Sequence, residues 1–196
     1  MNYLELSETD VRKESRKLAK KIEKDFNPEV VIFIAKGSYY IGDELSKYFN
    51  VSLLEIHAAR EKNKLKKIIS PMLKLIPKNI KKRLRELEII SGIHNKKNIR
   101  NVYMKEKLEN KLQNYKKVLL VDDSVDSGNT ILAILNYLKK YNLEIKIAAL
   151  NVFNVSKEVV TINYFNYEDI MLNGPWSNDS KYNSSFLKDY MKWKMK

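Results

Sequence analysis

Residues 118–130 have the sequence VLLVDDSVDSGNT, in which a strand pattern runs directly into a cluster of polar residues. The four apolar residues at its start predict a strand that is covered on both faces, as in a parallel sheet. Apolar residues at Ile131, Leu135 and Leu138 then predict a helix with one buried face. A buried strand that leads into a helix is typical of an α/β fold, so we expect the polar residues between them to lie at the sheet edge where ligands bind.

The first half of the chain has the same organisation. The apolar run at residues 30–35 predicts a second buried strand, which is followed by Lys36-Gly37, a helical pattern at 40–49 and a strand at 51–56. The other predicted elements are a helix at 8–26 that begins with a capping box of Ser7 and Asp10, strands at 145–152, 159–164 and 169–172, and a basic, aromatic C-terminal helix or tail from residue 182. We therefore expect an α/β fold with a central, mostly parallel sheet flanked by helices.

The composition indicates one soluble globular domain. The chain has 196 residues, of which 44% are apolar and 31% charged, a balance typical neither of disorder nor of a fibrous protein. It has no cysteine and only two histidines, His57 and His94, which excludes disulfides, thiolate zinc sites and multi-histidine metal sites. No apolar run is long enough to span a membrane and residues 1–10 do not have the pattern of a signal peptide, so we expect a cytoplasmic protein.

The net charge of +13 comes from one segment. Residues 61–117 contain 18 Lys and Arg against 5 Asp and Glu, and in the rest of the chain the two signs balance at 19 each. An apolar stripe from Ile69 to Leu87, with lysines beside it, predicts a pair of basic amphipathic helices. Three interpretations are open: a helical hood or dimer element whose charge attracts a polyanionic substrate, which we favour, a surface for nucleic acid, or a surface for an anionic membrane.

The polar residues at 122–130 have the chemistry of a site for a phosphorylated sugar. A loop that enters a helix offers backbone N–H groups and the positive end of the helix dipole to a phosphate. Gly128 lets the main chain approach the anion, and Ser127 and Thr130 add hydroxyl donors without a competing negative charge. Asp122 and Asp123, at the end of the strand, could accept hydrogen bonds from sugar hydroxyls or hold magnesium.

Residues 118–130 resemble the phosphoribosyl pyrophosphate motif of the type I phosphoribosyltransferases, in which an apolar strand leads into two acids and an acid-Ser/Thr-Gly-x-Thr loop. In that family a basic residue and a glycine after the first core strand hold pyrophosphate, often through a cis peptide, and Lys36-Gly37 stands at that place. Residues 169–176, DIMLNGPW, resemble the Pro-Trp segment of the xanthine-guanine and hypoxanthine branch.

The resemblance covers residues 28–56 and 117–176 of a single phosphoribosyltransferase-like domain, and leaves a basic insertion at about 57–116 and the segment 177–196 outside this core. It implies a small hood, phosphoribosyl pyrophosphate and a nucleobase-like molecule as substrates, Mg²⁺ as the cofactor, a role in purine salvage, and a homo-oligomer, either a dimer or a tetramer.

Carried over position by position, the resemblance also implies a role for each motif residue. Asp122 and Asp123 would contact the ribose hydroxyls and magnesium, and Asp126 would be the general base for the ring N–H of the attacking nucleobase. Lys36 and Gly37 would hold the pyrophosphate. The 5′-phosphate would lie in the loop formed by Asp126, Ser127, Gly128, Asn129 and Thr130.

Two positions depart from the purine-using branch. Asn154 stands where that branch has a lysine that reads the 6-oxo group, and Met171 falls near the position of its base-stacking aromatic ring. Trp176 either takes over the stacking or packs in the core or hood. We expect a 6-oxopurine, namely guanine, xanthine or hypoxanthine, as the first candidate acceptor. The alternatives are a non-purine acceptor, or a regulator that keeps the fold and senses phosphoribosyl pyrophosphate or a nucleotide.

Overall fold

The computed structural model describes residues 2–60 and 100–195. The strands are β1 (Asn2–Glu5), β2 (Val30–Ile34), β3 (Ser52–Arg60), β4 (Arg100–Tyr103), β5 (Lys117–Val125), β6 (Glu144–Val152), β7 (Tyr164–Glu168) and β8 (Ile170–Asn173). The helices are α1 (Glu8–Ile22), α2 (Tyr39–Phe49), α5 (Glu106–Leu112), α6 (Asn129–Leu138), α7 (Asn154–Lys157) and α8 (Asn183–Lys194). The chain divides into two compact units, Met1–Ala58 with Val102–Lys196, and Ala59–Asn101, and the packing and the sites below belong to the first.

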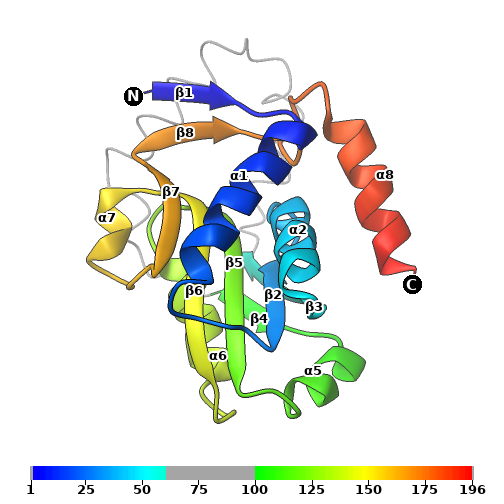
Figure 1. Cartoon of the computed structure of the whole chain (residues 1–196), viewed down its shortest axis with the longest axis vertical. Helices are drawn as coiled ribbons and strands as arrows, with labels where there is room; N and C mark the ends of the chain where they lie inside the picture. The colour runs from blue at the N-terminus through cyan, green and yellow to red at the C-terminus, as the bar shows by residue number, and fades with distance from the viewer. Residues whose placement is uncertain (1, 61–99, 196) are drawn as a thin grey trace. The chain divides into compact units, whose positions relative to one another are not determined.

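Six strands form the main sheet in the order β4-β3-β2-β5-β6-β7 (Figure 1). Parallel pairing connects β3 to β2, β2 to β5, β5 to β6 and β6 to β7. The carboxyl ends of these strands therefore lie at one edge of the sheet, which is where α/β proteins bind ligands. The expectation of an α/β fold with a mostly parallel sheet is confirmed.

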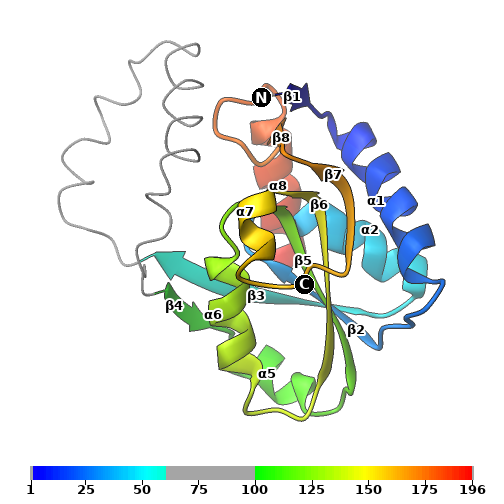
Figure 2. The ribbon, with the colours of Figure 1, turned by 90° about the vertical axis from the view of Figure 1, so that its left-hand side faces the viewer.

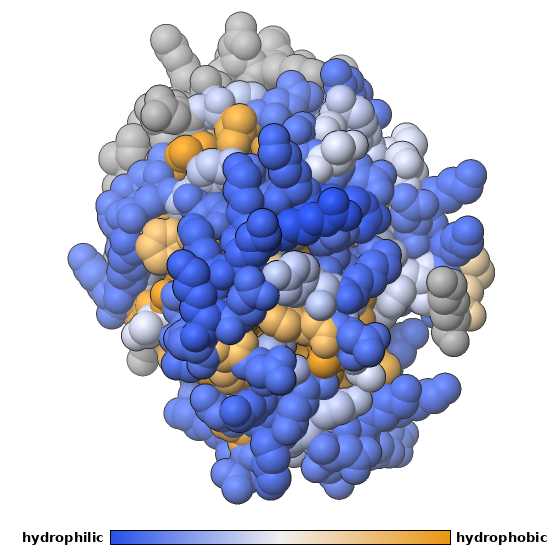
Figure 3. All heavy atoms as spheres, in the orientation of Figure 1, coloured by the Kyte–Doolittle hydropathy of each residue, from blue (hydrophilic) through white to orange (hydrophobic). Residues whose placement is uncertain are grey.

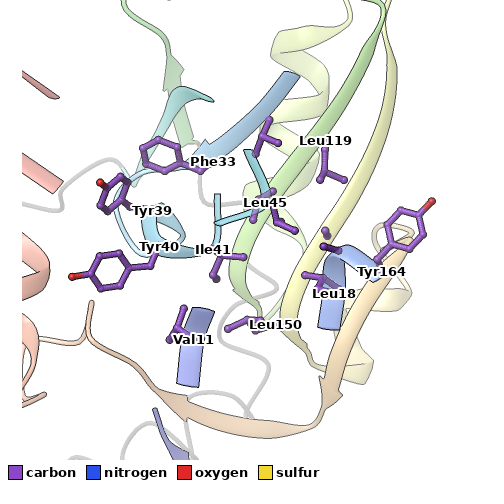
Figure 4. Packing of buried hydrophobic residues seen from close by; sticks show 14 of the residues in the cluster. Val11, Leu18, Phe33, Tyr39, Tyr40, Ile41, Leu45, Leu119, Leu150 and Tyr164 are labelled. Carbon is purple, nitrogen blue, oxygen red and sulfur yellow. The ribbon is translucent and has the colours of Figure 1, made fainter. Parts of the chain in front are cut away.

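Alternate residues of a strand point to opposite faces of a sheet, so the apolar runs of β2 and β5 present an apolar surface on both faces. Helices cover both of these faces. On one face α1, α2 and α8 pack with Val31, Phe33 and Leu119 in an apolar cluster, part of which is drawn in Figure 4. On the other face α5 and α6 pack with Ile32 and Leu120. Figure 2 shows α6 on the opposite side of the sheet from α1 and α2. The surface of the face seen in Figure 3 is largely hydrophilic, as expected when the apolar side chains of the helices point inward.

The strands β1 and β8 form a small parallel sheet of their own, which we call the hood sheet. Its register runs from Asn2 opposite Ile170 to Glu5 opposite Asn173. The backbone N–H of Asp169, just before β8, donates to the carbonyl of Val152 at the end of β6, at 3.0 Å. The hood sheet is therefore joined to the main sheet at the edge where the carboxyl ends of the strands lie.

Two expectations about strands are wrong. Residues 159–164 do not form a strand, because the N–H groups of Val159 and Val160 both donate to the carbonyl of Ser156, at 3.0 Å, and continue the turn of α7. The edge strand β7 begins only at Tyr164. The acid pair also does not end its strand, because β5 continues to Val125 and pairs with β6 along that length.

The N-terminal helix has the predicted capping box, in which Ser7 Oγ accepts from the Asp10 N–H at 3.2 Å, but it ends at Ile22 rather than at residue 26. The described parts of the insertion at 57–116, which was expected to be helical, contain both strand and helix: β3 extends to Arg60, β4 is its neighbour in the sheet, and α5 follows β4. The apolar stripe from Ile69 to Leu87 lies outside the described residues. In the part of the chain that the structure describes, no helix has the length and apolar character needed to cross a membrane.

Candidate functional site

The two motifs that the sequence analysis singled out come into contact. Strands β2 and β5 are parallel neighbours, and Phe33 of β2 is opposite Val121 of β5. The residues that follow Phe33 therefore lie beside the residues that follow Val121. The peptide bond between Ala35 and Lys36 is cis, as the family resemblance implies for this loop. A Cβ atom on Gly37 would lie only 2.5 Å from Oδ1 of Asp123, so a glycine is required for the loop to approach this carboxylate so closely.

Asp122 and Asp123 are neighbouring acids whose negative charges repel each other. Asp122 is 8% exposed, and its Oδ1 accepts a hydrogen bond from the backbone N–H of Asp123 at 3.0 Å. Burial, and then the negative charge of Asp123, raise the pKa of Asp122 well above its usual value. A cation or a group of hydroxyl donors between the two carboxylates would relieve this repulsion.

The donor set of this pair fits magnesium. Mg²⁺ is a hard cation that is bound by one or two carboxylates, by substrate oxygens and by water rather than by a complete cage of protein ligands. Asp122 and Asp123 supply two adjacent carboxylates of this kind. Among the described residues, no group of three or more acids and histidines is placed to hold a metal ion.

The loop at 126–130 has the conformation of an anion site. Gly128 is the N-cap of α6 and has a φ of 73°, in the left-handed region where a residue with a side chain is strained. A Cβ atom there would lie 2.9 Å from Cγ2 of Val160, so this glycine also lets the loop pack on the segment after α7. Nδ2 of Asn129 donates to Oγ of Ser127 at 3.1 Å. The backbone N–H groups of the first turn of α6 point out of the N-terminal end of the helix, which is the geometry that favours an anion.

The half-buried Asp126 is held by residues that the sequence analysis missed. Oγ of Ser124 donates to Oδ1 of Asp126 at 3.2 Å, and Nδ2 of Asn151 donates to Oγ of Ser124, also at 3.2 Å. Ser124 is part of the motif and Asn151 interrupts an otherwise apolar strand at 147–152, which is the signal that could have found them. Their proximity depends on the register of β5 and β6, in which these two residues are opposite each other.

Asn154 is engaged by Asp169 at the hood. Its backbone N–H donates to Oδ1 of Asp169 at 2.9 Å, and its side-chain Nδ2 donates to Oδ2 of the same carboxylate. Asp169 has a φ of 54°, a conformation that Asp tolerates better than most residues. The Asn154 side chain has a second Nδ2 hydrogen to donate and an acceptor, Oδ1, whereas a lysine at this position could only donate.

The other two candidate base contacts differ from each other. Met171 is buried at 3% exposure in the hood sheet. The indole of Trp176 folds back over Gly174, where a Cβ would lie 2.4 Å from the ring, and it packs against the apolar cluster on the α1 side of the sheet. This contact favours the packing interpretation of Trp176 over base stacking.

The remaining sequence-predicted residues lie on the same two loops. Lys36 is half-buried next to Gly37, and Thr130 is a half-buried residue in the first turn of α6. The structure thus brings Gly37 against Asp123.

The comparisons with known proteins agree with this arrangement. The model of the phosphoribosyl transferase domain family matches residues 5–176. No curated protein matches the chain. Among solved structures, the purine phosphoribosyltransferase from Pyrococcus horikoshii Ot3 has a TM-score of 0.64 at 21% identity, and the alignment covers 92% of this chain and 97% of that one.

Two further structures have the same fold at similar distance. The xanthine-guanine-hypoxanthine phosphoribosyltransferase from Helicobacter pylori has a TM-score of 0.60 at 18% identity, with 93% of this chain and 99% of that one covered. A hypothetical protein from Neisseria gonorrhoeae with bound ppGpp has a TM-score of 0.61 at 16% identity, with 98% of each chain covered. Because the family match extends over most of the sequence and ends at the residues of the Pro-Trp segment, the chain belongs to the phosphoribosyl transferase domain family and is an enzyme of the phosphoribosyltransferase class.

Proposed function

We propose that this enzyme transfers the 5-phosphoribosyl group of phosphoribosyl pyrophosphate to a nucleobase, with a 6-oxopurine as the first candidate, and releases pyrophosphate. The observation that carries the proposal is the contact of Gly37 with the carboxylate of Asp123. The loop of Lys36 and Gly37, which would hold pyrophosphate, lies against Asp123, which would hold the ribose. The bond that breaks in the transfer joins the pyrophosphate to the ribose.

Each end of the sugar phosphate has a suitable partner. The N-terminus of α6 and the hydroxyl groups of Ser127 and Thr130 would bind the 5′-phosphate, since the positive end of the helix dipole and the backbone N–H groups of the first turn favour an anion there. Lys36 and the main chain of Gly37 would bind the pyrophosphate at the other end. Asp122 and Asp123 would accept hydrogen bonds from the ribose hydroxyls between them.

Asp122 and Asp123 would also hold the magnesium ion with the oxygens of the substrate. When bound, the ion supplies positive charge that offsets the two carboxylates and the pyrophosphate. The residues of this chain orient the sugar and exclude water from it, so that the nucleobase is the nucleophile that reaches the anomeric carbon.

Asp126 would act as the general base. In the transfer, the bond between the anomeric carbon and the pyrophosphate oxygen breaks, and its electron pair leaves with pyrophosphate. A ring nitrogen of the base forms the new bond to the anomeric carbon, and the proton of that nitrogen passes to the carboxylate of Asp126. The chemistry needs no covalent nucleophile, which agrees with a chain that has no cysteine.

The contacts of Asn154 bear on the identity of the base. The side chain donates one of its two Nδ2 hydrogens to Asp169, so a second donor hydrogen and the acceptor Oδ1 are left for a ligand. Oδ1 can accept a hydrogen bond from the N1–H of a 6-oxopurine or from the 6-amino group of adenine. These contacts support a purine acceptor, and the fold neighbours named as purine phosphoribosyltransferases agree with it.

The proposal is tested by pyrophosphate release from phosphoribosyl pyrophosphate and magnesium with guanine, xanthine, hypoxanthine, adenine, uracil and orotate in turn. Base-dependent release that the Asp122→Asn/Asp123→Asn variant loses is the expected result, and it names the acceptor. Binding of phosphoribosyl pyrophosphate without turnover of any base would favour a sensor instead. If phosphoribosyl pyrophosphate does not bind, the proposed function is wrong.

A further inference from the structure

We infer that Ser124 and Asn151 are positioning residues that orient the carboxylate of Asp126 and couple it to the hood strand β8. The inference rests on the proposed function, in which Asp126 receives the proton of the base. It concerns two residues that do not touch the substrate themselves and that act through Asp126.

Asn151 has a position that an apolar residue would ordinarily occupy. It is completely buried, and the residues of β6 around it, from Ile147 to Val152, are otherwise apolar and buried. Burying an amide in such a place is unfavourable unless both of its polar atoms have partners. Asn151 has one partner on each neighbouring element, because its Nδ2 donates to Ser124 on β5 and its Oδ1 accepts from the N–H of Ile170, at 3.1 Å, at the start of β8.

These contacts give the network a single direction. The N–H of Ile170 can only donate, so it selects Oδ1 of the Asn151 amide and turns Nδ2 toward Ser124. Nδ2 can also only donate, so the hydroxyl of Ser124 receives this hydrogen bond on its oxygen. The hydroxyl hydrogen is then directed at Oδ1 of Asp126. One oxygen of the carboxylate is thereby occupied, and Oδ2 is the oxygen left to take the proton from the base.

The network also connects two parts of the site that bind different parts of the substrates. Asp126 begins the loop of the 5′-phosphate, whereas Ile170 precedes Met171 in the hood sheet, which would contact the base. Ser124 and Asn151 are opposite each other in the register of β5 and β6, so no long side chain is needed to join the two. A shift of β8 would move the Asn151 amide, and through Ser124 it would turn the Asp126 carboxylate.

The first test is the kinetics of pyrophosphate release in variants of the pair. Ser124→Ala is expected to lower kcat about 3- to 10-fold, the effect of losing one hydrogen bond to the reacting carboxylate, with KM for phosphoribosyl pyrophosphate within about 2-fold of wild type. Ser124→Thr retains the hydroxyl and is expected to restore kcat. Asn151→Leu is expected to lower kcat similarly, and the Ser124→Ala/Asn151→Leu variant to lose little more than either alone, since both changes break one connected network.

Asn163→Ala is the matched control. Oδ1 of Asn163 accepts a hydrogen bond from the N–H of Ile147, at 2.8 Å, in the middle of the same strand β6. Replacing Asn163 by alanine removes a hydrogen bond between an Asn side-chain oxygen and a backbone N–H, as the replacement of Asn151 does. It leaves Ser124 and Asp126 unchanged. It is therefore expected to lower Tm and leave kcat unchanged, whereas a purely structural role for Asn151 would give the two variants the same behaviour.

The second test does not depend on activity. Amide hydrogen exchange at Ile170 is expected to be faster in Ser124→Ala than in wild type, because the Asn151 amide loses the contact that holds it against Ile170. If wild type releases pyrophosphate and Ser124→Ala has full kcat, the positioning role is wrong and the proposed function stands. If wild type turns over no base but Ile170 exchange responds, the coupling stands and the proposed function fails. Unchanged Ile170 exchange overturns the coupling.

Discussion

Replacing Gly37 by alanine tests whether the loop after β2 and the acid pair form one site. The new Cβ would lie 2.5 Å from Oδ1 of Asp123, and ordinary contact begins at 3.4 Å, so the carboxylate must move by about 0.9 Å. A displacement of about 1 Å in a group that positions the substrate lowers catalysis by about 100-fold. We therefore expect Gly37→Ala to lower kcat/KM by about this factor.

The same change is expected to have little effect on stability. The clashing atoms are at the end of the Asp123 side chain, and turning such a group away from its preferred rotamer costs about 0.5–1.5 kcal/mol. Replacing a glycine whose φ suits alanine restricts the unfolded chain and offsets about 0.4–1 kcal/mol of that cost. The free energy of unfolding should then stay within about 1 kcal/mol of wild type, which corresponds to about 2–4 °C in Tm for a domain of this size.

The assay combines pyrophosphate release with thermal unfolding, and Gly42→Ala provides the opposite pattern. A Cβ on Gly42 would lie 2.8 Å from Cβ of Phe33, which cannot turn away, so overpacking of about 1–3 kcal/mol exceeds the helix propensity that alanine gains. That variant should lose stability and retain kcat per folded molecule. Full activity of Gly37→Ala at saturating magnesium would refute the reasoning, because it would mean that the position of the Asp123 carboxylate does not matter.

Three further results are expected from substitutions elsewhere. Gly128→Ala should lower the free energy of unfolding by about 1–2 kcal/mol for the left-handed conformation alone, and Gly128→Asn by less; equal loss in both variants, measured by urea unfolding, would point to the steric contact instead. The pKa of Asp122 is raised in the folded protein, so the folded state binds this proton more tightly than the unfolded chain does. Wild-type stability should therefore fall as the pH rises from 3.8, the pKa of Asp122 in the unfolded chain, through its raised pKa in the folded protein. The Asp122→Asn variant should lack that fall when Tm is followed against pH without divalent ions, and parallel curves would contradict the raised pKa. Tyr190→Phe removes a donor from the 1%-exposed carboxylate of Glu55 and should cost about 1–3 kcal/mol in a calorimetric melt, whereas an unchanged Tm would show that the hydrogen bond contributes nothing.

The elements that the sequence predicted are those whose signal is local. The apolar runs of β2 and β5 and the capping box of Ser7 and Asp10 need no distant partner to be recognised. The short strand β1 was missed, because its partner β8 lies more than 160 residues away in the chain and four residues carry little pattern. The β-branched Val159 and Val160 favour a strand at 159–164, but their N–H groups are used by the turn of α7.

In the candidate site, too, the residues with a local sequence signal were predicted and those that depend on strand register were not. Motif spacing predicted Lys36-Gly37 and residues 122–130, and the parallel register of β2 and β5 is enough to bring them together. The network of Ser124 and Asn151 could not be predicted, because it depends on which residues of two strands are opposite each other. Trp176 was a candidate for stacking on the base, and its folding back on Gly174 is decided by a backbone turn that has no signal in the residue types alone.

The pairing of β1 with β8 determines when the enzyme can first become active during synthesis. The strands of the main sheet from β2 to β6 have all been made by residue 152, so they can begin to associate while later residues are still being translated. Strand β1, however, has to wait for β8, because its partner residues 170–173 are made only after β6. A nascent chain stopped before residue 170 would hold the acid pair and the phosphate loop without the hood strand. Translation itself therefore delays assembly of the hood sheet until residue 173 has been made.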